Sequence, residues 1–192
     1  TTLHDFMFRN PLLACDHDAV FINDRRQRLK DGIWWDIHCD PICDLGYDCI
    51  HLDPSDNHQK SPLKTDTVRP LHPLKLLASV RGSTNRSDVR LPTQVRRGLK
   101  TVEGEIKSHF DISINLQDKI ENSLRKRKIR LPLYIKSLRR INPKFCLVIP
   151  SWGGREIFIE ACQQLGIPTI ELQHGSPNKY HLGYSYEHAS KE

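Results

Sequence analysis

A strand–helix–strand pattern spans residues 145–172 and constrains the fold more than any other stretch of this 192-residue chain. Two short apolar runs, residues 145–149 and 169–172, have the length and side-chain types of strands buried in a parallel sheet, with Ile170 expected to face the core. Between the runs, apolar residues recur every three to four positions up to Leu165, which is the period of an amphipathic helix. A strand, a helix and a second strand in this order form the repeating unit of a parallel α/β sheet.

Strand patterns also occur near the start of the chain. Apolar runs at residues 19–23 and 49–52 predict two more buried strands. Residues 32–37 alternate apolar and polar side chains, which predicts a strand with Ile33 and Ile37 on its buried face. Strands that alternate with helices predict an α/β fold with a Rossmann-like, doubly wound parallel sheet.

Helical periodicity dominates the region before the pattern at residues 145–172. It predicts one helix over residues 95–110, with Thr93 as its N-cap, and a second over residues 116–130. Pro132 fits the first turn of a helix, so we expect a third helix to begin there.

The chain is long enough for one well-packed domain and too short for two Rossmann-like domains of ordinary size. We expect residues 1–186 to form one Rossmann-like domain. Within it, residues 53–92 are rich in proline and small polar residues and are predicted to be mostly a long loop region. Residues 187–192 resemble the start of a linker, which suggests a fragment of a longer protein whose C-terminal domain is missing here.

Two loops follow the carboxyl ends of the last two predicted strands, and in an open parallel sheet such loops meet at the edge where ligands bind. The first loop carries Gly153, Gly154 and Arg155 ahead of the helix, so that backbone N–H groups and a cation can hold an anion. The second carries His174, whose imidazole can accept a proton near neutral pH. From spacing alone, His174 is equally well explained as a loop histidine without a catalytic role.

These loops also carry a family resemblance. The string GREIFIEACQQLGIPTIELQHG, followed by YHLGYSY, resembles the N-terminal half of the two-domain (GT-B) glycosyltransferases that build capsule and surface polysaccharides. The string HGSPNK, which begins at His174, is similar to the His-Gly-Thr-Pro loop of CDP-glycerol glycerophosphotransferases. The chain departs from that pattern at Gln173, where those enzymes usually have Trp, and at Ser176, which replaces Thr.

The resemblance implies a transferase in which His174 is the catalytic base that deprotonates an acceptor hydroxyl. The donor would be a nucleotide-activated sugar or CDP-glycerol, and the acceptor a carbohydrate. Donor binding in such enzymes falls mainly to the C-terminal domain, so no donor-binding residue can be assigned, and the isolated chain is expected to be inactive. The residues expected to bind substrate at this edge are Gly153, Gly154, Arg155, Gln173, Gly175, Ser176, His181 and Tyr184.

Arg25 and Arg26 follow the predicted strand at residues 19–23 and therefore lie at another carboxyl end. A guanidinium there can form two hydrogen bonds with a phosphate or carboxylate, so both residues are candidates for binding an anionic acceptor. A solvated basic turn is an equally good explanation of them.

The formal net charge of +6 favours anionic partners, and residues 125–130 hold five of the cations. This run supports a different function, that of a non-catalytic α/β module that binds nucleic acid or an anionic membrane surface. No aromatic residues interrupt the run, so we expect no nucleic-acid partner. Without a signal sequence or an apolar run of about 20 residues, a cytoplasmic protein is expected, with peripheral association at the inner face of the membrane left open.

Six cysteines form no Cys-x-x-Cys pair, and we expect them to be reduced thiols. Cys39 and Cys43, with His38 and His51, invite a zinc interpretation, but the two cysteines are not matched by a second pair of ligands at the usual spacing. We therefore expect neither a metal nor a cofactor.

Overall fold

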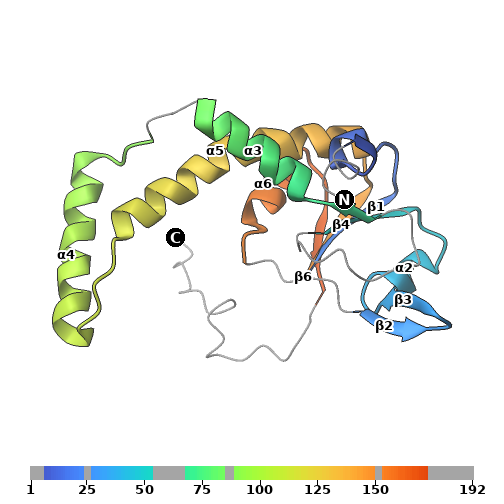
Figure 1. Ribbon diagram of the computed structural model, residues 1–192, viewed down its shortest axis with the longest axis horizontal. Helices are drawn as coiled ribbons and strands as arrows, with labels where there is room; N and C mark the ends of the chain where they lie inside the picture. The colour runs from blue at the N-terminus through green and yellow to red at the C-terminus, as the bar shows by residue number, and fades with distance from the viewer. Residues whose placement is uncertain (1–6, 24–26, 54–67, 85–88, 150–152, 173–192) are drawn as a thin grey trace, which may run out of the picture. The chain divides into compact units, whose positions relative to one another are not determined.

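The computed structural model describes residues 7–23, 27–53, 68–84, 89–149 and 153–172 (Figure 1). The chain divides into two compact units. The sheet unit comprises Thr1–Pro73 and Tyr134–Glu192, and the helical unit comprises Leu74–Leu133. Residues 1–186, which were expected to form one Rossmann-like domain, thus include parts of both units, and the helical unit lies in the long crossover between two strands of the sheet.

A five-stranded, entirely parallel sheet forms the sheet unit, with the strand order β5-β4-β1-β6-β7 (Figure 1). The first three strands in the chain lie on one side and the last two on the other, so that β1 and β6 are neighbours. This is the Rossmann-like order, and it confirms the predicted α/β fold. The strands are β1 (Ala19–Asn23), β4 (Cys49–Asp53), β5 (Val68–Pro70), β6 (Phe145–Ile149) and β7 (Thr169–Glu171).

Both faces of the central strands are buried, as continuous apolar runs predict. Ala19 of β1 pairs with Cys49 and Phe145, and this face packs against Cys39 at the start of the short helix α2 (Asp40–Cys43). The opposite face carries Cys146, which interacts with Cys162 of helix α6 (Glu156–Gln164). Helices therefore cover the two faces of the sheet.

Aromatic packing holds α6 in place. The ring of Phe158 is fully buried and meets the ring of Tyr134 edge-on, with 5.7 Å between the centroids. Gly166 ends the helix region with φ +68°, a conformation that glycine adopts without steric cost. After it, Ile170 of β7 is 46% exposed, so the expectation that it faces the core is wrong. Among the described residues, β7 pairs on one side only, with β6.

A two-stranded antiparallel hairpin follows β1, formed by β2 (Gln27–Lys30) and β3 (Ile33–Asp36). Asp31 and Gly32 join the strands with φ values of +52° and +77°, which is the backbone of a type I′ hairpin turn. The predicted strand at residues 32–37 exists, but outside the parallel sheet. Its predicted buried face is wrong, because Ile33 and Ile37 are exposed and Asp36 is buried.

Regular structure occupies part of residues 53–92, which were predicted to be mostly loop. β5 forms the edge of the sheet, where Pro70 at its end removes no hydrogen bond that the sheet needs. Helix α3 (His72–Thr84) follows directly, with Pro73 in its first turn, where the missing N–H is harmless. β5 has only three residues, so no apolar run marks it in the sequence.

Two longer helices complete the chain, α4 (Thr93–Phe110) and α5 (Leu116–Ile141). Pro92, and not the predicted Thr93, occupies the N-cap of α4, and no side chain caps it. Pro132 lies inside α5 and does not begin a new helix. Lys128, whose carbonyl group loses its hydrogen-bond donor to this proline, is exposed, so water can replace the missing donor.

A short 3-10 helix, η1 (Pro11–Leu13), precedes β1 and is capped by the Asn10 side chain. Within the described ranges, none of the helices combines the length and the apolar character that crossing a bilayer requires.

Candidate functional site

The strand order creates a switch point between β1 and β6. The chain leaves β1 towards β4 on one side, whereas it leaves β6 towards β7 on the other. In open parallel sheets, ligands bind at the carboxyl ends of the two strands at such a point. These ends are Asn23 of β1 and Ile149 of β6, which pair with each other.

Eight of the predicted site residues lie outside the described residues, so the structure does not place them. They are Arg25, Arg26, Gln173, His174, Gly175, Ser176, His181 and Tyr184. The described part of the predicted site is the turn between β6 and α6.

That turn contains two exposed glycines, Gly153 and Gly154, with φ values of +80° and +94°. Residues with a side chain rarely adopt these angles, so the sequence needs glycine here. The turn delivers the chain into the first turn of α6, whose backbone N–H groups carry partial positive charge. This is a backbone that can approach an anion closely.

Arg155, the cation predicted to help hold an anion at this edge of the sheet, is a buried residue at the start of α6. The residue is only 5% exposed and forms the N-cap of α6, where its carbonyl group accepts hydrogen bonds from Phe158 and Ile159 at 2.9 and 3.0 Å. Its guanidinium folds back towards the turn, because a Cβ atom built on Gly153 would lie 3.3 Å from Nη1. The Arg155 side chain therefore packs against the backbone of Gly153.

The chain matches no family model, no curated protein and no solved structure. The assignment of sites therefore depends on the geometry of the chain itself.

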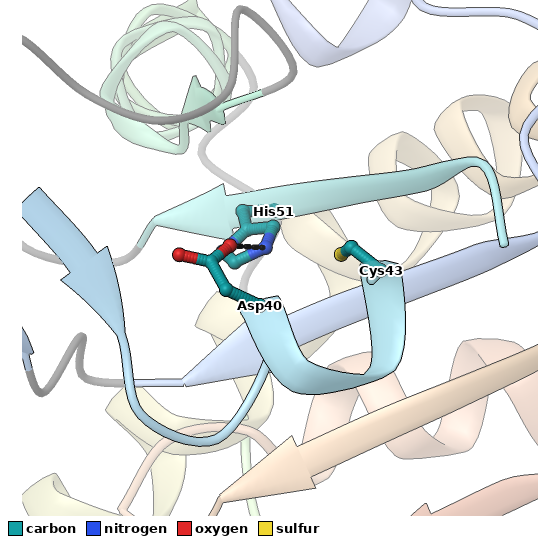
Figure 2. Close-up of side chains that lie close together, drawn as sticks. All are labelled: Asp40, Cys43 and His51. Atoms are coloured by element: carbon teal, nitrogen blue, oxygen red, sulfur yellow. Dashed lines mark ion pairs between the residues drawn. The ribbon is translucent and has the colours of Figure 1, made fainter. Parts of the chain in front are cut away.

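A second group of chemically active side chains lies between α2 and β4 (Figure 2). Asp40 and Cys43 project from this helix, one turn apart, and His51 projects from β4 towards them. One carboxylate oxygen, the sulfur and one ring nitrogen lie within 4.8 Å of one another. Asp40 and His51 are buried, and Cys43 is partly exposed.

Hydrogen bonds from the neighbouring backbone fix this group. The Asp36 N–H donates to Oδ2 of Asp40 at 2.6 Å, which leaves Oδ1 of Asp40 facing His51. The buried Asp36 carboxylate in turn accepts hydrogen bonds from the N–H groups of His38 and Cys39, both at 3.0 Å. The end of the hairpin therefore orients α2 and its carboxylate.

The thiols around the group have different acidities. A hydrogen bond from the Cys49 thiol, with a further contribution from the nearby His51 ring, lowers the pKa of Cys43 to about 6. The same hydrogen bond, together with burial, raises the pKa of Cys49. Burial and the adjacent Asp36 carboxylate raise the pKa of Cys39. Cys43 is thus the thiol of this group that most readily becomes a thiolate, because the neighbouring Cys49 thiol, and to a lesser extent His51, lowers its pKa.

The sequence had placed Cys43 and His51 in a candidate zinc set with Cys39 and His38. The structure brings together Cys43 and His51 but completes the group with Asp40. The signal for Asp40 was its position three residues before Cys43, since residues at this spacing share one face of a helix.

A basic pocket occurs in the helical unit, between α3 and α5. It has a volume of about 360 Å³. Its lining residues include four cations, namely Lys75, Arg125, Lys126 and Arg130. Three of the five cations of the predicted basic run therefore line one concave surface.

Proposed function

We propose that this chain is the acceptor-side half of a GT-B transferase for surface polysaccharide synthesis. It moves a sugar or glycerol-phosphate group from a nucleotide-activated donor to a hydroxyl group of a carbohydrate acceptor. The observation that supports this proposal is the glycine turn at Gly153 and Gly154, which follows a strand at the switch point of a Rossmann-like sheet. The resemblance of residues 154–175 to such enzymes supports it from the sequence.

The proposed reaction needs a base and a site for negative charge. His174 takes the proton of the acceptor hydroxyl as its oxygen attacks the donor. With a sugar nucleotide, the sugar C1–O bond breaks and a nucleoside diphosphate leaves; with CDP-glycerol, the bond between the two phosphates breaks and CMP leaves. The backbone at the start of α6 stabilises an anionic group of the substrate.

The test is an assay of the protein encoded by the whole gene with sugar nucleotides and CDP-glycerol, each with and without a carbohydrate acceptor. We expect release of the nucleotide product that depends on the acceptor, because transfer needs both substrates. Acceptor-independent release alone, or no release from any donor, would contradict the proposal.

The location that fits this reaction is the cytoplasm, where nucleotide-activated donors are made. Peripheral association with the inner face of the membrane would bring the enzyme to a lipid-linked acceptor. The cations of α5 supply an attraction of about 1 kcal/mol each near an acidic lipid surface.

The basic pocket favours a second candidate function, a non-catalytic module that binds an anionic polymer or surface. Lys75, Arg125, Lys126 and Arg130 line one pocket and are concentrated enough to attract phosphate groups. Cations in the middle of a solvated helix are also common without a partner. The two functions therefore differ in what happens when the basic run is neutralised.

We expect that glutamine at Arg125, Lys126, Arg127 and Lys128 changes the free energy of unfolding by less than about 1 kcal/mol, because three of these side chains are exposed. Transferase activity on soluble acceptors should also persist. Thermal denaturation and the nucleotide-release assay measure both effects.

The matched control neutralises four exposed cations of the same unit away from the pocket, which are Arg97, Lys100, Lys107 and Lys119. The second function is the correct one if only the basic-run variant loses tight, salt-sensitive binding to nucleic acid or to acidic vesicles, and if the wild-type protein shows no transferase activity.

A further inference from the structure

His51 is buried without the polar partners that a buried imidazole needs. Its side chain is 1% exposed, and neither ring nitrogen makes a hydrogen bond of ordinary length and angle. Nε2 lies 3.9 Å from Oδ1 of Asp40, which is too far for a hydrogen bond. An unpartnered polar group in a protein interior costs free energy, so a ligand between these atoms would explain their arrangement.

The separations suit a metal ion. Zinc binds nitrogen and oxygen at about 2.0–2.2 Å and sulfur at about 2.3 Å, so tetrahedral ligands lie about 3.3–3.6 Å apart. The three side-chain atoms here lie within 4.8 Å of one another, with Nε2 of His51 at 3.9 Å from Oδ1 of Asp40. Shortening these separations by up to about 1.5 Å, which side-chain rotation can supply, brings the three atoms to the spacing of tetrahedral zinc ligands. Figure 2 shows all three side chains directed at the same space.

The surroundings already hold the ligands in the orientation that a metal requires. The Asp36 N–H donates a hydrogen bond to Oδ2 of Asp40, which leaves Oδ1 directed at His51. Such outer contacts orient ligands in metal proteins and help to determine their affinity.

We propose that Asp40, Cys43 and His51 form a zinc-binding site. One thiolate, one imidazole and one carboxylate form a mixed set that suits zinc and is too soft for magnesium or calcium. Three protein ligands leave the fourth position to water, and partly exposed Cys43 gives the ion a route into the site. The proposal replaces the expectation of no metal, which weighed the spacing of Cys and His and did not consider Asp40.

The experiment uses cobalt(II) as a spectroscopic substitute for zinc in chelator-treated protein. We expect one equivalent of cobalt to bind with a sulfur-to-cobalt charge-transfer band, which zinc abolishes by displacement. Cys43→Ser should lose the band, whereas Cys15→Ser, at an exposed free cysteine, should retain it. Asp40→Asn should weaken cobalt binding at least about tenfold.

A measurement on the unaltered protein covers the case in which a variant does not fold. Zinc should raise the melting temperature of chelator-treated wild-type protein, since a ligand that binds only the folded state stabilises it. Absence of both the band and the melting-temperature increase overturns the proposal and leaves Asp40 and His51 as a metal-free buried pair. A band that persists in folded Cys43→Ser overturns it equally.

Discussion

Replacing His174 by alanine is expected to lower transferase turnover by about 10²–10⁴-fold, which corresponds to roughly 3–5 kcal/mol of transition-state stabilisation. In the proposed reaction, the acceptor hydroxyl would lose the base that removes its proton. His174 follows the last described strand, β7, with only Leu172 and Gln173 between them. Turnover and melting temperature should be measured on the same preparation of the protein encoded by the whole gene.

The melting temperature separates a catalytic role from a structural one. A base at the edge of the sheet can be removed with little loss of stability, whereas a structural histidine with a satisfied hydrogen bond costs about 1–3 kcal/mol on removal. His109→Ala, at an exposed position of α4, is the matched control and should change neither quantity. Turnover of His174→Ala within a few-fold of the wild type would remove the catalytic assignment. A large fall in melting temperature with a proportionate loss of activity would favour the structural role.

Replacing Phe158 by alanine is expected to lower the free energy of unfolding of the sheet unit by about 3–5 kcal/mol. The Phe158 ring projects from α6, is fully buried and makes the edge-on contact with the Tyr134 ring. Its removal loses both the apolar burial and the aromatic pair, and it leaves a cavity that the packed sheet cannot close. Chemical denaturation, followed by circular dichroism, measures the change.

Phe110→Ala is the matched control, because this side chain is 70% exposed at the end of α4. The control should change the free energy of unfolding by less than about 0.5 kcal/mol. A loss of under 1 kcal/mol for Phe158→Ala would contradict the packing described for α6, since it would mean that the ring is not buried in solution.

The elements that could be predicted from the sequence are those whose local pattern and final environment agree. β1, β6 and α6 were predicted because buried strands read as apolar runs and a half-buried helix shows a 3.6-residue period. β2 was missed because it has only Leu29 as an apolar residue and pairs with β3 through its backbone. Pro132 was predicted to begin a helix, but it lies inside α5. It is tolerated there because the carbonyl group of Lys128 is near solvent, and the sequence alone does not show that exposure.

In the candidate sites, too, local features could be predicted from the sequence, whereas features that depend on tertiary packing could not. The glycine turn could be predicted because positive φ angles demand glycine at Gly153 and Gly154. The burial of Arg155 could not, since it depends on how α6 packs against the sheet. The grouping of Asp40 with His51 likewise depends on the approach of α2 to β4, and no spacing within either segment reveals that approach.

The placement of the helical unit within the chain has a consequence for how the protein folds. β1 and β6 form the central pair of the sheet and align Ala19 with Phe145, so all of Leu74–Leu133 lies in the loop that this pair closes. Pairings between segments so distant in sequence are slow to form, although the entropy of closing a loop grows only with the logarithm of its length. A helical unit that collapses early shortens the distance between the two strands. We therefore expect the switch point between β1 and β6 to be among the last parts of the sheet to form.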